Sequence, residues 1–191
     1  MNNYEYIIAS LPLIGASDRT LPETDAIISE IRDRLNDKDA ESLDFVLSIY
    51  RDGTDPEDFY TRAAASRSAF IRDYCGYDRI VKNVKVEYLN KALDRPEGTD
   101  IVLPGEEEFE DRAKVLEILS GNDILARERA LDDIMWNKAE ELTVLHVFDL
   151  DVILGFVAKL KIIDRWARLD EGTGREFFRK LVNEIRNNRT I

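Results

Sequence analysis

The chain of 191 residues is poor in the groups that most enzymes use: it has one cysteine and one histidine. Cys75 has no partner, so no disulfide can form within the chain and the sequence gives no sign of an oxidising compartment. A di-iron helical bundle needs two Glu-x-x-His units, which one histidine cannot supply. Phosphate-binding glycine loops, Gly-x-Ser-x-Gly and Cys-x-x-Cys are also missing. We therefore expect no catalytic site, no cofactor and no metal.

Long apolar runs and basic charge are scarce as well. The longest apolar run of the most apolar segment, residues 152–158, is far shorter than the ~20 residues that cross a bilayer. The start of the chain has no basic region and is interrupted by Pro12, so it does not read as a signal peptide. A net charge of −12 argues against nucleic acid. We expect a cytoplasmic protein, either free or peripheral at the inner face of the cell membrane.

Apolar residues recur every three or four positions through most of the chain, which predicts an all-α fold, a bundle of seven to eight helices. The β-branched and aromatic residues 4–11 favour a short extended N-terminal segment. Helices are expected from residue 25, after residues 36–39, from Pro56, over 77–92, 106–119, 122–145 and 150–169, and from Thr173.

The segment 77–92 fits two patterns. Val84, Val86 and Tyr88 alternate as in a strand, whereas Tyr77, Val81 and Val84 follow a helical spacing. We favour the helix because the segment is long and ends in good helix formers, and we place its start after Gly76.

An acidic loop, residues 95–105, leaves open whether the chain forms one domain or two lobes. One helical domain over residues 1–191 is favoured, and the alternative is two lobes, 1–94 and 106–191, joined by residues 95–105. The helix 150–169 should lie at the centre of either arrangement because it is apolar around most of its circumference. Its predicted core residues are Ile153, Phe156, Val157, Leu160 and Ile163.

Two groups of residues give weak support to a metal-binding or catalytic function. Four acidic residues at helical spacings could hold Mg²⁺: Glu107, Glu110, Glu128 and Asp132. With 39 acidic residues in the chain, such spacings arise by chance, and a solvated acidic face is the simpler interpretation. A nucleophilic pair of Cys75 and His146 rests only on the presence of both residues, and we expect Asp149 to lie across a helix break from the histidine.

Charge is unevenly distributed along the chain. Residues 94–111 contain eight acidic residues and one arginine, whereas residues 172–191 contain five basic and two acidic residues. Such an uneven distribution of charge is typical of a solvated face and also suits docking between partners of opposite charge. We expect Trp136 in the core. The predicted partner contacts are Arg165, Trp166, Arg175 and Arg179.

Several stretches spread over nearly the whole chain resemble a bacterial family of uncharacterised proteins associated with V/A-type rotary ATPases. They are Tyr4-x-Tyr6-Ile7-Ile8-Ala9-Ser10-Leu11-Pro12, Arg72-Asp73-Tyr74, Asn83 to Asn90, Arg127-Glu128-x-x-Leu131-Asp132, Phe148-Asp149-Leu150-Asp151, Lys159 to Ile162, Arg165-Trp166 and Gly174-Arg175-x-Phe177. The resemblance implies a place like that of the central-stalk subunit of these ATPases, a helical funnel without an active site that joins the membrane ring to the central shaft. That funnel has three helical modules and needs well over 300 residues.

The resemblance therefore implies a non-catalytic adaptor whose partners are the central shaft and the membrane ring of a rotary ATPase. Two alternatives stay open: a helical interaction or regulatory domain unrelated to the ATPase, and an Mg²⁺-dependent helical nucleotide hydrolase.

Overall fold

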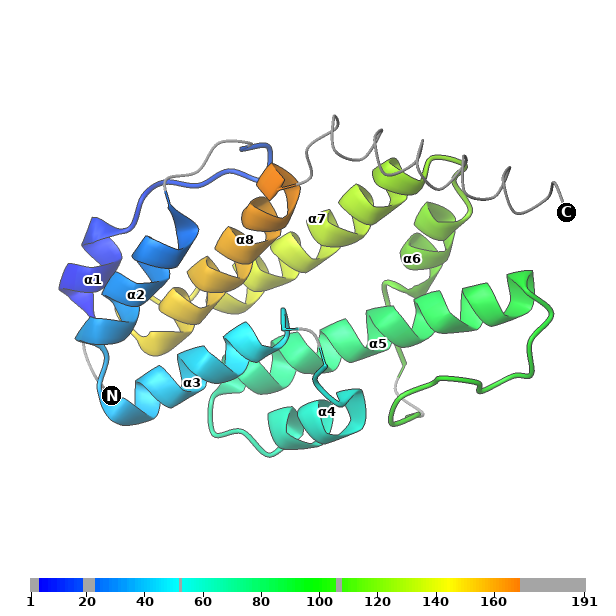
Figure 1. Ribbon diagram of the computed structural model, residues 1–191, viewed down its shortest axis with the longest axis horizontal. Coiled ribbons are helices and arrows are strands. Elements are labelled where there is room, and N and C mark those ends of the chain that lie inside the picture. Colours follow the sequence, from blue (N-terminus) through cyan, green and yellow to red (C-terminus); the bar gives the residue numbers. More distant parts are fainter. Residues whose placement is uncertain (1–3, 19–22, 52, 106–107, 169–191) are drawn as a thin grey trace, which may run out of the picture.

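The computed structural model describes residues 4–18, 23–51, 53–105 and 108–168, and every regular element within them is an α-helix (Figure 1). The eight helices are α1 (Glu5–Ser10), α2 (Thr24–Arg34), α3 (Asp37–Ser48), α4 (Pro56–Ala64), α5 (Ala69–Ala92), α6 (Arg112–Leu119), α7 (Ile124–Thr143) and α8 (Leu150–Arg168). The predicted all-α bundle of seven to eight helices is confirmed.

The extended N-terminal segment predicted for residues 4–11 is wrong, because residues 5–10 form α1. The β-branched and aromatic composition suits a strand only where a neighbouring strand can pair with it. Here the segment packs against helices instead: Tyr4 and Ile7 are buried, and the Tyr4 amide donates to the Phe148 carbonyl at 2.8 Å. Tertiary contacts therefore decide its conformation.

Helix starts follow the expected capping chemistry in most places. Asp55 accepts from the Glu57 amide at 3.3 Å with Pro56 in the first turn, as the sequence predicts. Two helices begin later than predicted. α7 begins at Ile124, capped by Asp123, rather than at residue 122, and α6 begins at Arg112 rather than at residue 106. α2, expected from residue 25, begins at Thr24, which is buried.

The helix favoured for residues 77–92 is confirmed, but its predicted start is wrong. α5 runs without interruption through Gly76 and begins after Ser68, whose hydroxyl accepts from the Ile71 amide. A glycine inside a helix costs only about 1 kcal/mol. The buried positions Tyr74, Cys75, Val81 and Val84 on either side of Gly76 outweigh that cost.

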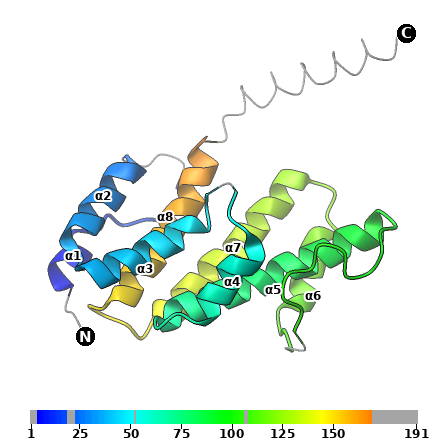
Figure 2. The same ribbon diagram turned by 60° about the horizontal axis from the view of Figure 1, so that its bottom comes forward.

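α8 is the central element of the bundle. It packs against α7 along most of its length and also contacts α2, α3 and α5 (Figures 1 and 2). α5 in turn contacts α4, α6 and α7. Helices before and after the acidic loop thus share one continuous hydrophobic core.

The predicted core of α8 is confirmed. Ile153, Val157, Leu160 and Ile163 are completely buried and Phe156 is nearly so, and Trp136 of α7 is also in the core. Gly155 permits the close approach of the two helices, since a Cβ there would lie 2.5 Å from Cγ2 of Thr143. The helix predicted from Thr173 lies outside the described residues, as do Arg175 and Arg179.

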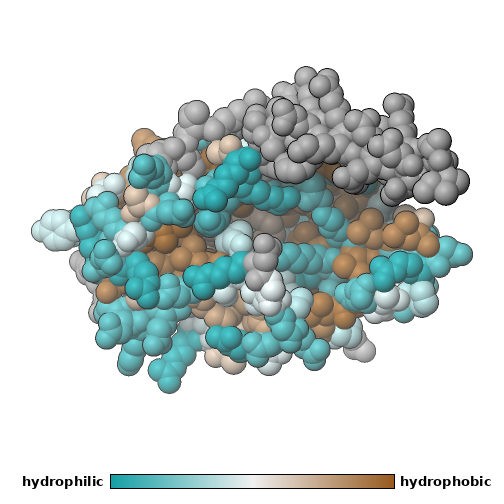
Figure 3. Space-filling model, in the orientation of Figure 1, coloured by the Kyte–Doolittle hydropathy of each residue, from teal (hydrophilic) through white to brown (hydrophobic). Residues whose placement is uncertain are grey.

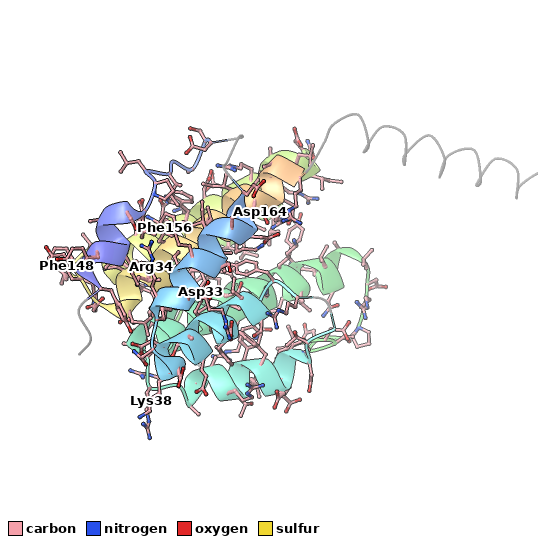
Figure 4. The ribbon with its side chains drawn as sticks, turned by 60° about the vertical axis from the view of Figure 1, so that its left-hand side comes forward. Asp33, Arg34, Lys38, Phe148, Phe156 and Asp164 are labelled. Atoms are coloured by element: carbon pink, nitrogen blue, oxygen red, sulfur yellow. The ribbon has the colours of Figure 1, made fainter. Side chains whose placement is uncertain are left out.

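The burial of α8 generates a stability prediction with a matched control. Figure 4 labels two phenylalanines: Phe156 within the bundle, and Phe148 at its outer end beside α1. We expect Phe156→Ala to lower the free energy of unfolding by about 3–5 kcal/mol, because it leaves a cavity in a packed core. Phe148→Ala, at a side chain 42% exposed, should cost under about 1 kcal/mol. Urea unfolding followed by circular dichroism measures both; equal losses would contradict the central position of α8.

Candidate interaction site

Arg165 joins α8 to α7 through two carboxylates. Its Nη1 lies 3.0 Å from Oδ1 of Asp132, and its Nη2 lies 3.1 Å from Oε2 of Glu128. Glu128 and Asp132 are four residues apart, so both project from the same side of α7. Lys85 of α5 also pairs with Glu128, and the cluster therefore ties three helices together.

Trp166 is part of the same cluster. Its indole Nε1 donates to Oδ2 of Asp132 at 2.6 Å, and the guanidinium carbons of Arg129 and Arg165 lie 5.4 Å and 5.9 Å from its ring centroid. The ring is half-buried and packs against the core. Arg165 and Trp166, two of the four predicted partner contacts, are thus adjacent and already engaged within the chain. The Arg165 side chain still exposes 49% of its surface.

The two carboxylates of the cluster respond differently to their surroundings. Burial raises the pKa of Asp132, and Arg165 and the Trp166 N–H only partly offset that effect. Burial also acts against ionisation of Glu128, but Lys85 and Arg165 together outweigh it and lower the pKa of that carboxyl. Glu128 is therefore the firmly ionised member of the pair.

A cleft of about 260 Å³ opens beside this cluster between α5, α7 and α8. Its polar lining includes Asp78, Lys82 and Lys161. Lys82 lies 2.8 Å from Asp78, which also accepts from Tyr60 at 2.6 Å, and Lys161 lies 2.9 Å from Asp164. The cations of the cleft are thus paired with carboxylates of the chain itself.

The acidic constellation proposed for Mg²⁺ is not assembled in the described part of the chain. Glu128 and Asp132 face the cations of the ion-pair cluster, Glu110 is exposed before α6, and Glu107 lies outside the described residues. Within residues 4–18, 23–51, 53–105 and 108–168, no three His, Cys, Asp or Glu side chains are grouped so that they could hold a metal ion.

Cys75 and His146 have separate environments. Cys75 is completely buried in α5, and burial raises the pKa of its thiol to about 12, so it stays protonated at neutral pH. His146 lies in the connection between α7 and α8, where its Nδ1 is 2.6 Å from Oδ2 of Asp149 and 4.0 Å from Asp151. The expectation that a helix break would separate His146 from Asp149 is wrong. Asp149 directly precedes α8, and its other carboxylate oxygen lies against the histidine ring.

The connection between α7 and α8 also exposes large apolar side chains. We call Val144, Leu145, Val147 and Phe148 the apolar tip; Leu145 is 91% exposed. Tyr6 of α1 is also exposed, and Tyr4 bonds to the backbone of Phe148, so α1 lies beside the tip. Contiguous exposed apolar side chains are typical of interaction sites. The sequence pattern did not reveal the tip, because Leu145 fits the inward-facing end of a longer helix.

The described residues form an all-helical protein in which the charged groups of the Arg165 cluster are paired within the chain and large apolar side chains are exposed at the connection between α7 and α8. None of the helices in the described ranges combines the length and apolarity that crossing a bilayer requires. A family described as "Protein of unknown function (DUF2764)" matches residues 91–189, more than half of the chain, and the protein belongs to this family. Comparison with curated proteins and with solved structures gives no match.

The ion-pair cluster predicts a difference between two adjacent aspartates of α7. Asp132→Ala removes the acceptor of Trp166 and one partner of Arg165 and should cost about 1–3 kcal/mol. Asp133→Ala removes a partly exposed pair with Arg129 and should cost under about 1 kcal/mol. Thermal and urea unfolding of both variants measure the difference. Equal losses would mean that the cluster does not stabilise the α7–α8 contact.

The His146–Asp149 pair predicts a pH effect. The hydrogen bond in which the Asp149 carboxylate accepts from the ring raises the pKa of His146 above its ordinary value of 6.5. The pair therefore stabilises the folded state fully below about pH 6.5, and this contribution is lost as the pH rises through the raised pKa. His146 is the only histidine, so its ring protons give one set of NMR resonances to titrate.

Asp149→Asn should bring the pKa of His146 back toward its ordinary value while keeping a side chain that can cap α8. Asp151→Asn, which alters the more distant carboxylate, should have a smaller effect. If Asp149→Asn leaves the titration unchanged, the observed pair does not exist in solution.

Proposed function

We propose that this protein is a non-catalytic adaptor of a V/A-type rotary ATPase, in a place similar to that of the funnel-shaped central-stalk subunit between the membrane ring and the central shaft. The resemblance of sequence stretches from Tyr4 to Phe177 to ATPase-associated proteins supports the assignment. The apolar tip is the observation that carries it, because it offers a recognition surface on a rigid helical scaffold.

The position of the tip suits an adaptor. α7 has 20 residues and is about 30 Å long, so it holds the tip well away from the Arg165 cluster near its other end. The charged side chains of the cluster are paired with one another, whereas the tip presents apolar area that a partner could cover. A partner at the tip would gain binding energy mainly from apolar burial.

The test is co-purification of ATPase subunits with the full-length tagged protein from native membranes. We expect shaft or ring subunits to co-purify with the wild-type chain, and the association to persist at about 1 M salt, where the Debye length is only about 3 Å. The double variant Leu145→Glu, Val147→Glu should lose most of this association, because it places charge on the buried side of the contact. Leu13→Glu, at another fully exposed leucine, is the matched control.

The adaptor proposal fails if the wild-type chain recovers no ATPase subunit. If subunits are recovered equally with the tip variant, the role stands and the tip is not the contact. In that case Arg165 and Trp166, which remain predicted contacts, are the next positions to vary. Recovery of unrelated proteins alone would favour the regulatory-domain alternative. Nucleotide hydrolysis that disappears in Glu128→Gln would favour the hydrolase.

A further inference from the structure

The acidic loop lies along α5 instead of projecting from the molecule. We call residues 94–105, which are this loop and Asp94, the strap. It turns back from the end of α5 and runs along that helix, far from α1 and the apolar tip (Figure 1). In Figure 3 the surface toward the right, where the strap lies in Figure 1, carries hydrophilic side chains among apolar ones. Val102 and Leu103 pack against the core, but none of the strap residues is buried.

Three side chains of α5 bind the main chain of the strap: Arg79, Asn83 and Asn90. They are spaced by four and seven residues, so they share one side of the helix. The middle one binds Val102 twice, since its Nδ2 donates to the carbonyl at 2.8 Å and its Oδ1 accepts from the amide at 3.1 Å. The other two donate to the carbonyls of Leu103 and Thr99. The strap is thus held to α5 by hydrogen bonds from one row of side chains, with few apolar contacts.

Contacts within the strap hold its residues to one another. Arg95 pairs with Asp100 at 2.7 Å, and the Thr99 hydroxyl donates to the Pro96 carbonyl at 2.7 Å. The Thr99 amide donates to the same carbonyl at 3.3 Å. None of these contacts involves α5, so the strap can keep them when it separates from the helix.

The closed strap also carries unfavourable features that opening would remove. Asp94, Asp100 and Leu103 have φ angles of 51°, 59° and 45°, in the left-handed region that residues with a Cβ disfavour. They are the non-glycine residues with positive φ in the described part of the chain. Asn90 is 3% exposed, and its Oδ1 has no hydrogen-bond partner. Such a buried acceptor is costly, and opening returns it to water.

We infer that the strap opens from α5 as one unit while the helical bundle stays folded. Segments with few buried apolar contacts open at a lower free energy than the core, and the closed strap combines this property with backbone strain and an unpaired acceptor. Opening uncovers the side of α5 that carries Arg79, Asn83 and Asn90. This goes beyond the adaptor proposal and does not depend on it, because the strap lies far from the apolar tip.

Native-state hydrogen exchange of the full-length protein, followed by NMR at low urea concentrations, tests the inference. The amides of Arg95 and Val102 report the two ends of the strap, since they donate to the Asn90 carbonyl at 2.9 Å and to Asn83 at 3.1 Å. Buried Val84 of α5 reports the bundle. We expect both strap amides to share one opening free energy that depends little on urea, whereas exchange at Val84 should depend strongly on it.

Glycine variants separate opening of the strap from unfolding of the bundle. Gly98 has φ +79° and no heavy atom within 4 Å of an added Cβ, so Gly98→Ala adds backbone strain alone and should speed exchange of both strap amides about 5–30-fold. Gly53→Ala is the matched control, because Gly53 has φ +81° and equally open surroundings outside the strap. It should leave the strap amides unchanged. Phe156→Ala, which weakens the core, should also leave them unchanged.

Asn83→Ala tests whether the strap opens as one unit. It removes both hydrogen bonds to Val102 and leaves a good helix former in α5. If the strap opens as a whole, exchange should also speed up about 5–30-fold at Arg95, whose own hydrogen bond the variant keeps.

Three results would overturn the inference. The first is a urea dependence at Arg95 and Val102 equal to that at Val84, which would mean that the strap opens only when the bundle unfolds. The second is an equal response of the strap amides to Gly98→Ala and Gly53→Ala. The third is faster exchange at Val102 alone in Asn83→Ala, which would mean that the two ends open separately. None of these results bears on the adaptor proposal, whose test is recovery of ATPase subunits.

Discussion

The burial of α8 is the constraint on which the rest of the structure depends. Nine of its residues are buried, from Ile153 to Ile163, and helices contact it from several sides. A helix surrounded in this way places its polar side chains mainly on the narrow stripe that its neighbours leave uncovered. Lys161, Asp164, Arg165 and Arg168 form that stripe. The ion pairs between the end of α8 and the start of α7 lie along this stripe.

Ion pairs along the stripe offset the free-energy cost of placing charged side chains beside the core. Arg165 brings a full charge to the edge of the core, where an unpaired cation would be costly. Asp132 and Glu128 of α7 meet it, and Lys85 of α5 completes the cluster. Glu128 and Asp132, which were considered as metal ligands in the sequence, are therefore better explained as ion-pair partners of Arg165.

The elements that the sequence predicts well are those that depend on local chemistry or on a strong period. Pro56 after Asp55 defines the start of α4, and the apolar period of residues 150–169 predicts both α8 and its buried face. The errors share one cause. Residues 4–11 have strand-like composition and Gly76 is a typical helix boundary, yet packing against distant helices overrides both preferences.

The interaction sites were less predictable because they depend on which helices become neighbours. Spacing alone shows that Glu128 and Asp132 share a side of α7, but not that Arg165 faces them. The apolar tip was missed for a different reason. Leu145 fits the apolar period of α7, which predicts that it is buried, but the helix ends at Thr143. One signal in the sequence did bear on this, since His146 precedes Asp149 by three residues, a spacing that allows the carboxylate to cap α8 and to bond the ring.

The two ends of α7 have different roles, because they differ in how charged side chains are paired and in which apolar side chains are exposed. At the start of α7, charged residues of α5, α7 and α8 pair with one another. At its end, the acidic side chains near the tip are also engaged: Glu141 with Lys138, Glu140 with Lys159, and Asp149 with His146. A partner at the tip therefore meets apolar surface without having to strip water from unpaired charges, which lowers the cost of binding there. Recognition at the tip should then rest on shape and apolar area, while the long-range negative field of the chain governs only how fast a partner approaches.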